Sequence, residues 1–466
     1  MSGDPLANSS FEHPIAALAT ATPGAIAVIR CSGERCIDLV ASVFDRPARL
    51  RSASGNSLHH GYVVDAGGVR IDEVVAAIYR APASYTGEDV VEVFCHGSAS
   101  AARLVLTTLL KAGFRAAEPG EFTRRAFLNG KLDLTQAEAV NEVVRAQTSR
   151  AHALAVDRLN GSVAGLLARL RARLVAVMSQ VAALLDYPEE DTPDARLDLE
   201  EIRHIEDDLL SVAATYDTGR ILQEGVRVAI AGRTNAGKSA LFNQILRQDR
   251  SIVSDTHGTT RDYIEALVDV RGIPVRLFDT AGLRSPTEAI EEEGIRRTRT
   301  IISAADLVLY VVAADAGFCE EDTRRLEEIA KRSPHVVVWN KVDIEPATAS
   351  KDGPATTRPA DAVPVCSLTG EGIDELNRVV ERLLLGDQSP GESSGEVVID
   401  SARQYDLLTR AAESLRVARD TASRGIPADA VAVDLQDALD AIGEITGEVA
   451  SAEILDAMFG AFCVGK

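Results

Sequence analysis

The stretch Val226-Arg-Val-Ala-Ile-Ala-Gly-Arg-Thr-Asn-Ala-Gly-Lys-Ser239 decides the fold of the central part of this chain. Its apolar start predicts a buried strand, its glycines predict a tight loop, and the apolar pattern after Lys238 predicts a helix. This order is the context of a phosphate-binding loop, in which backbone N–H groups cradle the phosphates. Lys238 would neutralise the β and γ oxygens, and Ser239 would offer a hydroxyl to magnesium. The binding residues predicted here are Asn235, Ala236, Gly237, Lys238, Ser239 and Ala240.

Short apolar runs around this loop alternate with helical stretches, which is the βαβ pattern of a doubly wound sheet. The predicted strands cover residues 226–231, 275–278, 307–312, 336–339 and 363–365. A low-complexity insert at residues 345–361 interrupts the pattern, and a Gly/Ser/Pro linker at residues 386–395 closes it. We therefore predict an α/β domain over residues 225–386.

Two further motifs would complete the phosphate and metal contacts. Phe278-Asp279-Thr280-Ala281-Gly282 ends a predicted strand, so Asp279 can reach the magnesium shell and the Gly282 N–H can sense the γ-phosphate. Gly258-Thr-Thr-Arg-Asp262 lies between the two phosphate motifs, and its Thr260 would give the metal a second hydroxyl. This position predicts a switch loop. The motifs add Thr260, Asp279, Thr280, Ala281 and Gly282 to the predicted nucleotide site.

Selection of guanine requires a carboxylate that accepts from the N1–H and N2–H groups of the base. Asn340-Lys341-Val-Asp343 follows a predicted strand and supplies that carboxylate in Asp343. The last loop, Cys366-Ser367-Leu368, departs from the usual Ser-Ala-Lys, but its contact with the guanine oxygen comes from backbone N–H groups. The pattern therefore predicts a GTP-hydrolysing domain, with Asn340, Lys341, Asp343, Cys366, Ser367 and Leu368 at the base.

The group that orients the attacking water is left open by these motifs. Many GTPases use a Gln directly after Asp-x-x-Gly, and Leu283 stands there in this chain. Leucine has no hydrogen-bonding side chain, so another group must act. The acidic residues of the following segment are candidates, with a solvated acidic loop as the simpler interpretation: Glu288, Glu291, Glu292 and Glu293.

Length and charge limit the remaining possibilities. With 466 residues the chain is expected to form two or three domains of a soluble globular protein. No apolar run approaches the roughly 18 residues of a membrane span, and the polar start lacks a signal sequence, which predicts a cytoplasmic protein without membrane contact. The net charge of −21 argues against general nucleic-acid binding, so RNA contact should be local. Clusters at Arg124-Arg125 and at Arg169, Arg171 and Arg173 are candidates, although solvated helix faces are the simpler interpretation.

Composition changes along the chain indicate the other domains. Short β-branched runs separated by turns dominate residues 1–95 and predict a small α+β domain. Residues 134–185 show helical spacing with almost no breakers, which predicts a helical hairpin or bundle. The tail at residues 398–466 is again helical. If it packs on the earlier helices, the α/β domain is an insertion within one helical domain.

Several further motifs resemble one known family, the bacterial and organellar tRNA-modification GTPases called MnmE or TrmE. They are Ser84-Tyr-Thr-Gly-Glu-Asp-Val-Val-Glu92, Pro119-Gly-Glu-Phe-Thr123, Arg125-Ala-Phe-Leu-Asn-Gly-Lys131-Leu-Asp-Leu-Thr-Gln-Ala-Glu138 and Phe462-Cys463-Val-Gly-Lys466. The resemblance implies a multidomain α/β and α protein with an N-terminal α+β folate-binding domain, a helical domain and an inserted Ras-like P-loop G domain. The expected spans are 1–130, 131–222, 225–386 and 397–466, the second and fourth being the two parts of the helical domain.

The resemblance also implies cofactors and their residues. A tetrahydrofolate derivative, the 5-formyl or the 5,10-methylene form, is expected at the positions matching Arg30, Glu92, Lys131 and Lys466. Cations suit the carboxylates of folate, and Glu92 can accept from pterin donors. Potassium is expected beside the phosphates, where it would offset transition-state charge when two G domains face each other. Its expected ligands are Asn235, Ser254, Thr256 and Thr259, and Glu291 matches the water-positioning glutamate.

The reaction implied by the resemblance is modification at C5 of the wobble uridine (position 34) of certain tRNAs. The expected assembly is a homodimer formed through the N-terminal domains, joined to an FAD-containing subunit in a heterotetramer. Cys463 matches a terminal cysteine of this chemistry, and its thiolate is a candidate nucleophile.

Two alternatives stay open beside this enzyme. One is a regulatory GTPase without a modification role, and the other is a folate-dependent one-carbon enzyme that uses GTP only for assembly. The N-terminal folate motifs and the terminal Cys-Val-Gly-Lys argue against the first alternative, because a ribosome-assembly GTPase needs neither. Titration with a reduced folate and with GTP, in potassium and then in sodium, separates all three.

Overall fold

The computed structural model describes residues 13–186, 197–248, 265–279, 302–344, 358–386, 397–449 and 451–466. The chain divides into two compact units. The first contains Met1–Asn141, Arg158–Leu197 and Thr421–Lys466, and the second contains Glu142–Asp157 and Asp198–Asp420.

The first unit contains a mixed sheet with the strand order β3-β4-β5-β2-β1-β6. Its strands are β1 (Ile15–Leu18), β2 (Ile26–Ser32), β3 (Ser57–Val64), β4 (Arg70–Tyr79), β5 (Val90–His96) and β6 (Arg115–Ala116). The β1–β6 pair is parallel and the other pairs are antiparallel. The register places Arg30 directly opposite Glu92.

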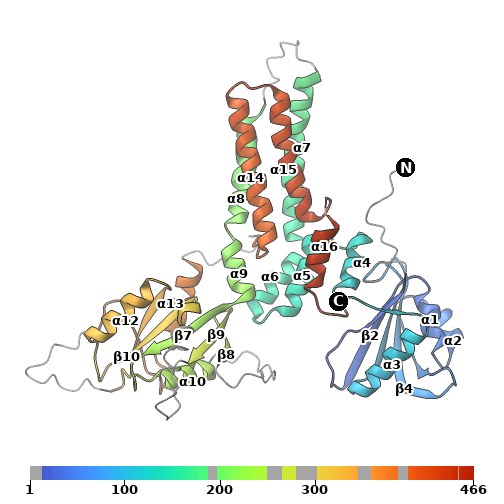
Figure 1. Cartoon of the computed structure of the whole chain (residues 1–466), viewed down its shortest axis with the longest axis horizontal. Coiled ribbons are helices and arrows are strands. Elements are labelled where there is room, and N and C mark those ends of the chain that lie inside the picture. The colour runs from blue at the N-terminus through green and yellow to red at the C-terminus, as the bar shows by residue number, and fades with distance from the viewer. Residues whose placement is uncertain are drawn as a thin grey trace, which may run out of the picture. The chain divides into compact units, whose positions relative to one another are not determined.

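Helices cover one face of this sheet (Figure 1). They are α1 (Cys36–Ser42), α2 (Pro47–Arg51) and α3 (Ala99–Lys111). Alternate residues of β2, Ala27, Ile29 and Cys31, face the core beneath them, which is the period-2 pattern of a half-buried strand. Helix α3 begins where the Ser98 side chain accepts a hydrogen bond from the Ala101 N–H.

The remaining helices of the first unit include two packed groups. Their bounds are α4 (Glu121–Leu128), α5 (Leu134–Arg145), α6 (Ser149–Leu159), α7 (Ser162–Asp186), α15 (Ala428–Thr446) and α16 (Ala452–Gly460). Helix α5 ends in the second unit, and α6 lies mainly in the second unit and ends in the first. Helix α15 packs along α7, and Arg171 pairs with Glu448 at 3.1 Å. Helix α16 packs on α4 through Phe459 and Phe127. The tail therefore packs on earlier helices, as predicted.

The second unit contains the predicted doubly wound sheet, with the order β12-β11-β10-β7-β9-β8. Its strands are β7 (Val226–Gly232), β8 (Glu265–Val270), β9 (Ile273–Asp279), β10 (Leu307–Ala313), β11 (His335–Asn340) and β12 (Val363–Val365). All pairs are parallel except β8–β9. The predicted strands are therefore confirmed, while the edge strand β8 was not predicted.

Both faces of this sheet carry helices, so its central strands are apolar throughout. Helices α10 (Lys238–Gln248) and α13 (Ile373–Leu385) cover one face, and α12 (Glu320–Ala330) covers the other. Along β10, Leu309 and Val311 belong to the first core, whereas Tyr310 belongs to the second. All residues of β10 are buried.

Further helices of the second unit are α8 (Leu199–Ala213), α9 (Tyr216–Glu224) and α14 (Ala402–Ser423), the last of which ends in the first unit. Helices α8 and α14 lie side by side, joined by an ion pair of Arg419 with Glu206 at 2.7 Å. Gly225 links α9 directly to β7 with φ 78°, a left-handed conformation that favours glycine.

Candidate functional site

The predicted phosphate loop lies between β7 and α10, at the carboxyl end of the parallel strands. Its backbone takes positive φ angles of 140° at Gly232, 60° at Asn235 and 94° at Gly237. A Cβ at Gly232 would collide with the carbonyl of Val311, and one at Gly237 would collide with the side-chain nitrogen of Asn340. These positions therefore require glycine, as the sequence pattern implies.

Lys238 and Ser239, predicted to contact phosphate and magnesium, lie together in this loop. Lys238 is buried, and its ammonium group donates to the carbonyl oxygens of Gly232 at 3.0 Å and Arg233 at 2.6 Å. The Ser239 hydroxyl donates to the carboxylate of Asp279 at 2.8 Å. Helix N–H groups of a first turn have no intrahelical acceptor and can receive an anion. Ser239 and Ala240 are exposed in the first turn of α10.

Asn340 ties the phosphate loop to the loop after β12. Its side chain is 1% exposed and donates to the carbonyl of Ala236 at 2.9 Å. Its oxygen accepts from the backbone N–H of Ser367 at 3.1 Å and from the Ser367 hydroxyl at 2.7 Å. A buried amide with both ends bonded fixes the distance between the two loops. The loop residues predicted from separate motifs thus lie together.

The predicted base-recognition residues lie around Asp343, which is exposed. The buried thiol of Cys366 donates to its carboxylate at 3.1 Å. Lys341, at φ 62°, pairs with Asp315 at 3.1 Å. Leu368 is 81% exposed at the end of the loop.

Some predicted residues fall outside the described part of the chain. They are Ser254, Thr256, Thr259, Thr260, Thr280, Ala281, Gly282 and Glu291. Arg233, Asp315 and Asp322 contact the described loops and were not predicted. The Gly317-x-Cys319-x-x-Asp322 spacing was a signal for Asp322, because a carboxylate at the third position of a helix commonly caps its amino end.

Two of the predicted folate residues of the first unit, Arg30 and Glu92, contact each other. Arg30 of β2 and Glu92 of β5 form a two-contact ion pair at 2.8 and 2.9 Å. The Arg30 guanidinium also donates to the Gly465 carbonyl at 3.3 Å. It lies over the ring of Tyr85, with 5.4 Å to the ring centre. The two predicted charges thus bind each other in this structure.

The tail places Cys463 and Lys466 beside the same pair. The backbone N–H of Gly120 donates to the Cys463 carbonyl at 3.3 Å, and that of Phe122 donates to the Lys466 carbonyl at 3.2 Å. Burial lowers the pKa of the Lys466 amine, and the nearby Arg30 charge lowers it further. Cys463 is exposed.

Lys131 contacts a different segment from Arg30, Glu92 and the tail. Its ammonium group donates to the Pro82 carbonyl at 3.1 Å, and it is exposed.

The basic cluster at Arg124-Arg125 is engaged within the protein. Arg125 is 2% exposed and pairs with Glu121 at 3.0 Å and Glu88 at 3.1 Å. Arg124 pairs with Asp456 at 2.6 Å. These side chains are therefore used in internal packing, so the cluster is neither a free RNA-contact patch nor the solvated helix face of the simpler interpretation.

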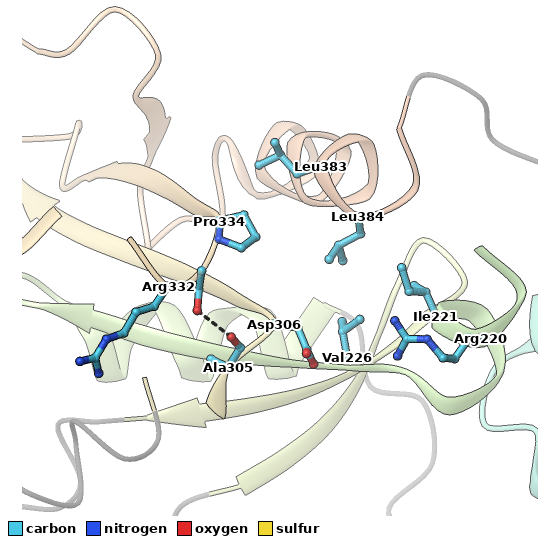
Figure 2. Close-up of a pocket in the computed structure, with 10 residues that line it drawn as sticks. Arg220, Ile221, Val226, Ala305, Asp306, Arg332, Pro334, Leu383 and Leu384 are labelled. Atoms are coloured by element: carbon cyan, nitrogen blue, oxygen red, sulfur yellow. Dashed lines mark hydrogen bonds between the residues drawn. The ribbon is translucent and has the colours of Figure 1, made fainter. Parts of the chain in front are cut away.

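A surface pocket of about 350 Å³ lies at the opposite end of the sheet in the second unit. Its walls include Val226 at the start of β7, Asp306 just before β10 and Pro334 just before β11 (Figure 2). Ligands of open α/β sheets bind beyond the carboxyl ends of the strands. None of the predicted site residues lines this pocket, so we do not assign the nucleotide to it. Among the described residues, no helix is both long and apolar enough to cross a membrane.

Comparison with known sequences gives family matches over most of the chain. The profile of the GTP-binding protein TrmE N-terminus matches residues 14–131, and that of the MnmE helical domain matches residues 134–463. The chain is 42% identical to the tRNA modification GTPase MnmE of Moorella thermoacetica, over 98% of this chain and 100% of that protein. It is 40% identical to the protein of the same name from Treponema denticola, over 98% and 99%.

Two solved structures are similar to part of this chain. A variant of Era from Aquifex aeolicus bound to GDP and AlF₄⁻ is 23% identical, with TM-score 0.26, covering 42% of this chain and 66% of that one. The G domain of the FeoB iron transporter of T. maritima is 23% identical, with TM-score 0.22, covering 34% and 98%. The sequence matches confirm the predicted fold class, with its N-terminal, helical and G domains. The chain belongs to the MnmE family of tRNA modification GTPases.

Proposed function

We propose that this GTPase of the MnmE family binds GTP and magnesium at the loops that follow β7, β9, β11 and β12, and uses hydrolysis to drive modification of the wobble uridine of tRNA. The observation that carries the proposal is the convergence of these loops. Asn340 joins Ala236 to Ser367, and Ser239 meets Asp279. Motifs predicted separately as contacts for phosphate, metal and base thus belong to one surface.

The chemistry of the donors fits magnesium. Mg²⁺ prefers oxygen ligands, and the Ser239 hydroxyl lies 2.8 Å from the Asp279 carboxylate. Ser239 would bind the ion directly, with Thr260 as the second hydroxyl and Asp279 at its shell. When bound, the ion would neutralise charge on the β- and γ-phosphates. Lys238 would leave the carbonyls of Gly232 and Arg233 and donate to the phosphate oxygens instead.

Selection of guanine would rest on Asp343. Its exposed carboxylate accepts from the N1–H and N2–H groups of guanine, and adenine lacks this donor pair. The backbone N–H groups of Ser367 and Leu368 would contact the guanine oxygen. Since Asn340 fixes the loop of Ser367 to the phosphate loop, base and phosphate contacts keep a constant separation.

We propose that hydrolysis is stimulated by potassium when two G domains face each other. Asn235 lies at a strained φ of 60° in the phosphate loop, where its side chain is exposed. It would bind the cation together with Ser254, Thr256 and Thr259, and the cation would offset charge that develops on the phosphates. Glu291 would orient the attacking water.

The first unit would bind the tetrahydrofolate derivative. Arg30 and Glu92 lie opposite each other on the sheet, the partly buried Lys466 lies close by, and Lys131 is the remaining predicted residue. Tyr85 beside Arg30 offers an aromatic surface for a pterin. The thiolate of Cys463 would be the nucleophile of the modification reaction.

The proposed assembly is a homodimer that works with an FAD-containing subunit and tRNA. The sheet face away from the helices supports an N-terminal dimer contact, because it carries exposed apolar side chains such as Ile26 and Leu58. A cytoplasmic location remains a prediction, as do the domain limits given above.

Exchange of Asp343 tests the nucleotide site. In Asp343→Asn an amide donor replaces half of the acceptor pair, so the preference for GTP over XTP should fall by about a hundredfold or more. The measurement is turnover of each nucleotide by the full-length protein in potassium and in sodium. The wild type should hydrolyse GTP faster in potassium.

An unchanged GTP preference in Asp343→Asn would remove Asp343 from base recognition. Equal wild-type rates in the two salts would reject the potassium proposal while leaving the GTP site intact. Mass spectrometry of wobble uridine from cells lacking the protein tests the tRNA reaction, and unaltered tRNA would favour a purely regulatory GTPase.

A further inference from the structure

The phosphate loop is held at its start by a buried carboxylate on a different element. Asp322, the third residue of α12, is 0% exposed. Its Oδ1 atom lies 3.2 Å from Nε of Arg233, the residue that follows β7. A second nitrogen of Arg233 donates to the carbonyl of Gly317. The loop is therefore bonded through Arg233 to the segment that begins α12.

Capping of α12 explains only part of the surroundings of Asp322. Its Oδ2 atom accepts from the Cys319 N–H at 3.0 Å and from the Cys319 thiol at 3.2 Å, which is a capping arrangement. The Oδ1 atom accepts from the Tyr310 hydroxyl at 2.9 Å and faces Arg233. Helix capping requires neither of these contacts. Burial and the bond to Asp322 raise the pKa of Tyr310, so its hydroxyl remains a donor.

Charge makes the Arg233 contact important. Burying a carboxylate without a cation is energetically unfavourable, so Asp322 stabilises the conformation of the loop that brings Arg233 to it. The carbonyl of Arg233 accepts from Lys238, and the next residues enter the strained φ of Asn235. Such backbone persists where its surroundings hold it. Asp322 holds the first part of the loop, and Asn340 holds Ala236 further along.

We infer that Asp322 is a positioning residue of the phosphate loop, acting through Arg233 to order the loop before nucleotide binds. The inference rests on the proposed assignment of this loop as the phosphate site. A loop ordered in advance loses less entropy on binding, so the pair contributes to affinity without touching the nucleotide.

A double-mutant cycle tests this role in the full-length protein. Asp322→Asn keeps the size and one oxygen that can still accept from the Cys319 N–H, but it removes the charge and the acceptor that faces Arg233. Arg233→Gln removes the partner cation. With fluorescent mant-GDP as the probe, each variant should raise the Kd about tenfold. The double variant should bind about as weakly as either single variant, because both remove the same interaction. Glu321→Gln, at an exposed position of the same helix, should bind like the wild type.

The outcomes distinguish three cases: Asp322 positions the loop, Asp322 only stabilises the fold, or the loop is not the phosphate site. A merely structural Asp322 would lower the melting temperature but leave the Kd of folded protein within about twofold, which would overturn the inference. Additive losses in the double variant would also overturn it. If Asp322→Asn does not fold, Arg233→Gln decides alone, since its side chain is partly exposed and its Kd must rise. Lys238→Ala tests the phosphate site itself, and an unchanged Kd there would reject the proposed site instead.

Discussion

Cys366 contacts the carboxylate that is proposed to recognise guanine. Its thiol is fully buried and donates to Asp343 at 3.1 Å, while the Thr369 N–H donates to its sulfur at 3.4 Å. A thiol is a weak hydrogen-bond donor, so this bond stabilises the orientation of the Asp343 carboxylate less than a bond from a hydroxyl would. At this position the side chain acts on the orientation of its neighbour, whereas the backbone of the same loop is proposed to contact the base.

Substitution of Cys366 should change affinity according to hydrogen bonding. Cys366→Val puts a slightly larger apolar side chain at this buried position and removes the donor, so the Kd for GDP should rise by about two- to tenfold. Cys366→Ser keeps a donor and should bind at least as well as the wild type. Calorimetric titration of the three proteins measures this, and equal affinity of the valine variant would show that Asp343 needs no support from this side chain.

At the scale of elements, a cluster of contacts joins the G-domain sheet to helix α6 within the second unit. Glu381 of α13 accepts from Arg150 at 3.2 Å and from Arg271 at 2.5 Å. Thr148, just before α6, donates to the Gly272 carbonyl at 2.8 Å. The turn Arg271-Gly272 connects β8 to β9, and β9 ends at Asp279. The strand that carries Asp279 is therefore bonded, through its own hairpin, to the start of α6.

Removal of Glu381 should loosen this connection locally. In Glu381→Ala, amide hydrogen exchange of the β8–β9 turn and of the start of α6 should rise about fivefold, which corresponds to about 1 kcal/mol of local stability. Hydrogen–deuterium exchange with mass spectrometry measures it. Glu375→Ala is the matched control, because Glu375 lies on the same helix in an exposed pair with Arg378. Unchanged exchange in Glu381→Ala would mean that the ion pairs of Glu381 add no local stability beyond the hydrogen bond from Thr148 to Gly272.

At the scale of the whole molecule, the two proposed chemistries belong to different compact units. Arg30, Glu92 and Cys463 lie in the first unit, and the nucleotide loops lie in the second. Among the residues that the structure describes, the contacts of each proposed site given above lie within its own unit. Chemistry at one site can therefore be removed without altering the contacts that form the other.

Exchange of Cys463 tests this separation. Cys463→Ser should keep basal GTP turnover within about twofold of the wild type, since the nucleotide loops keep all their contacts. Modification of tRNA should be lost if the thiolate is the nucleophile. Release of phosphate from GTP measures turnover, and mass spectrometry of tRNA from complemented cells measures the modification. Normal modification by this variant would remove Cys463 from the mechanism.

Local patterns were sufficient to predict the central sheet, because strands buried on both faces are continuously apolar. The same patterns missed β8 at the sheet edge, whose sequence Glu265-Ala-Leu-Val-Asp-Val has only a short apolar run between two acidic residues. The small α+β domain was predicted for residues 1–95 without strand bounds, and its edge strand β3 contains His59, His60 and Gly61. Edge strands bury only part of their surface, so their composition resembles that of loops.

By itself, the sequence determined the phosphate loop and the order of the motifs around it. Glycine spacing dictates where backbone can take positive φ and approach a phosphate, and this information is local. Only the tertiary structure decided that Asp322 meets Arg233, that Cys366 meets Asp343, and that Arg30 binds Glu92. These partners lie far apart along the chain and are brought together by strand order and register. Neither strand order nor register can be predicted from the residues of a single segment.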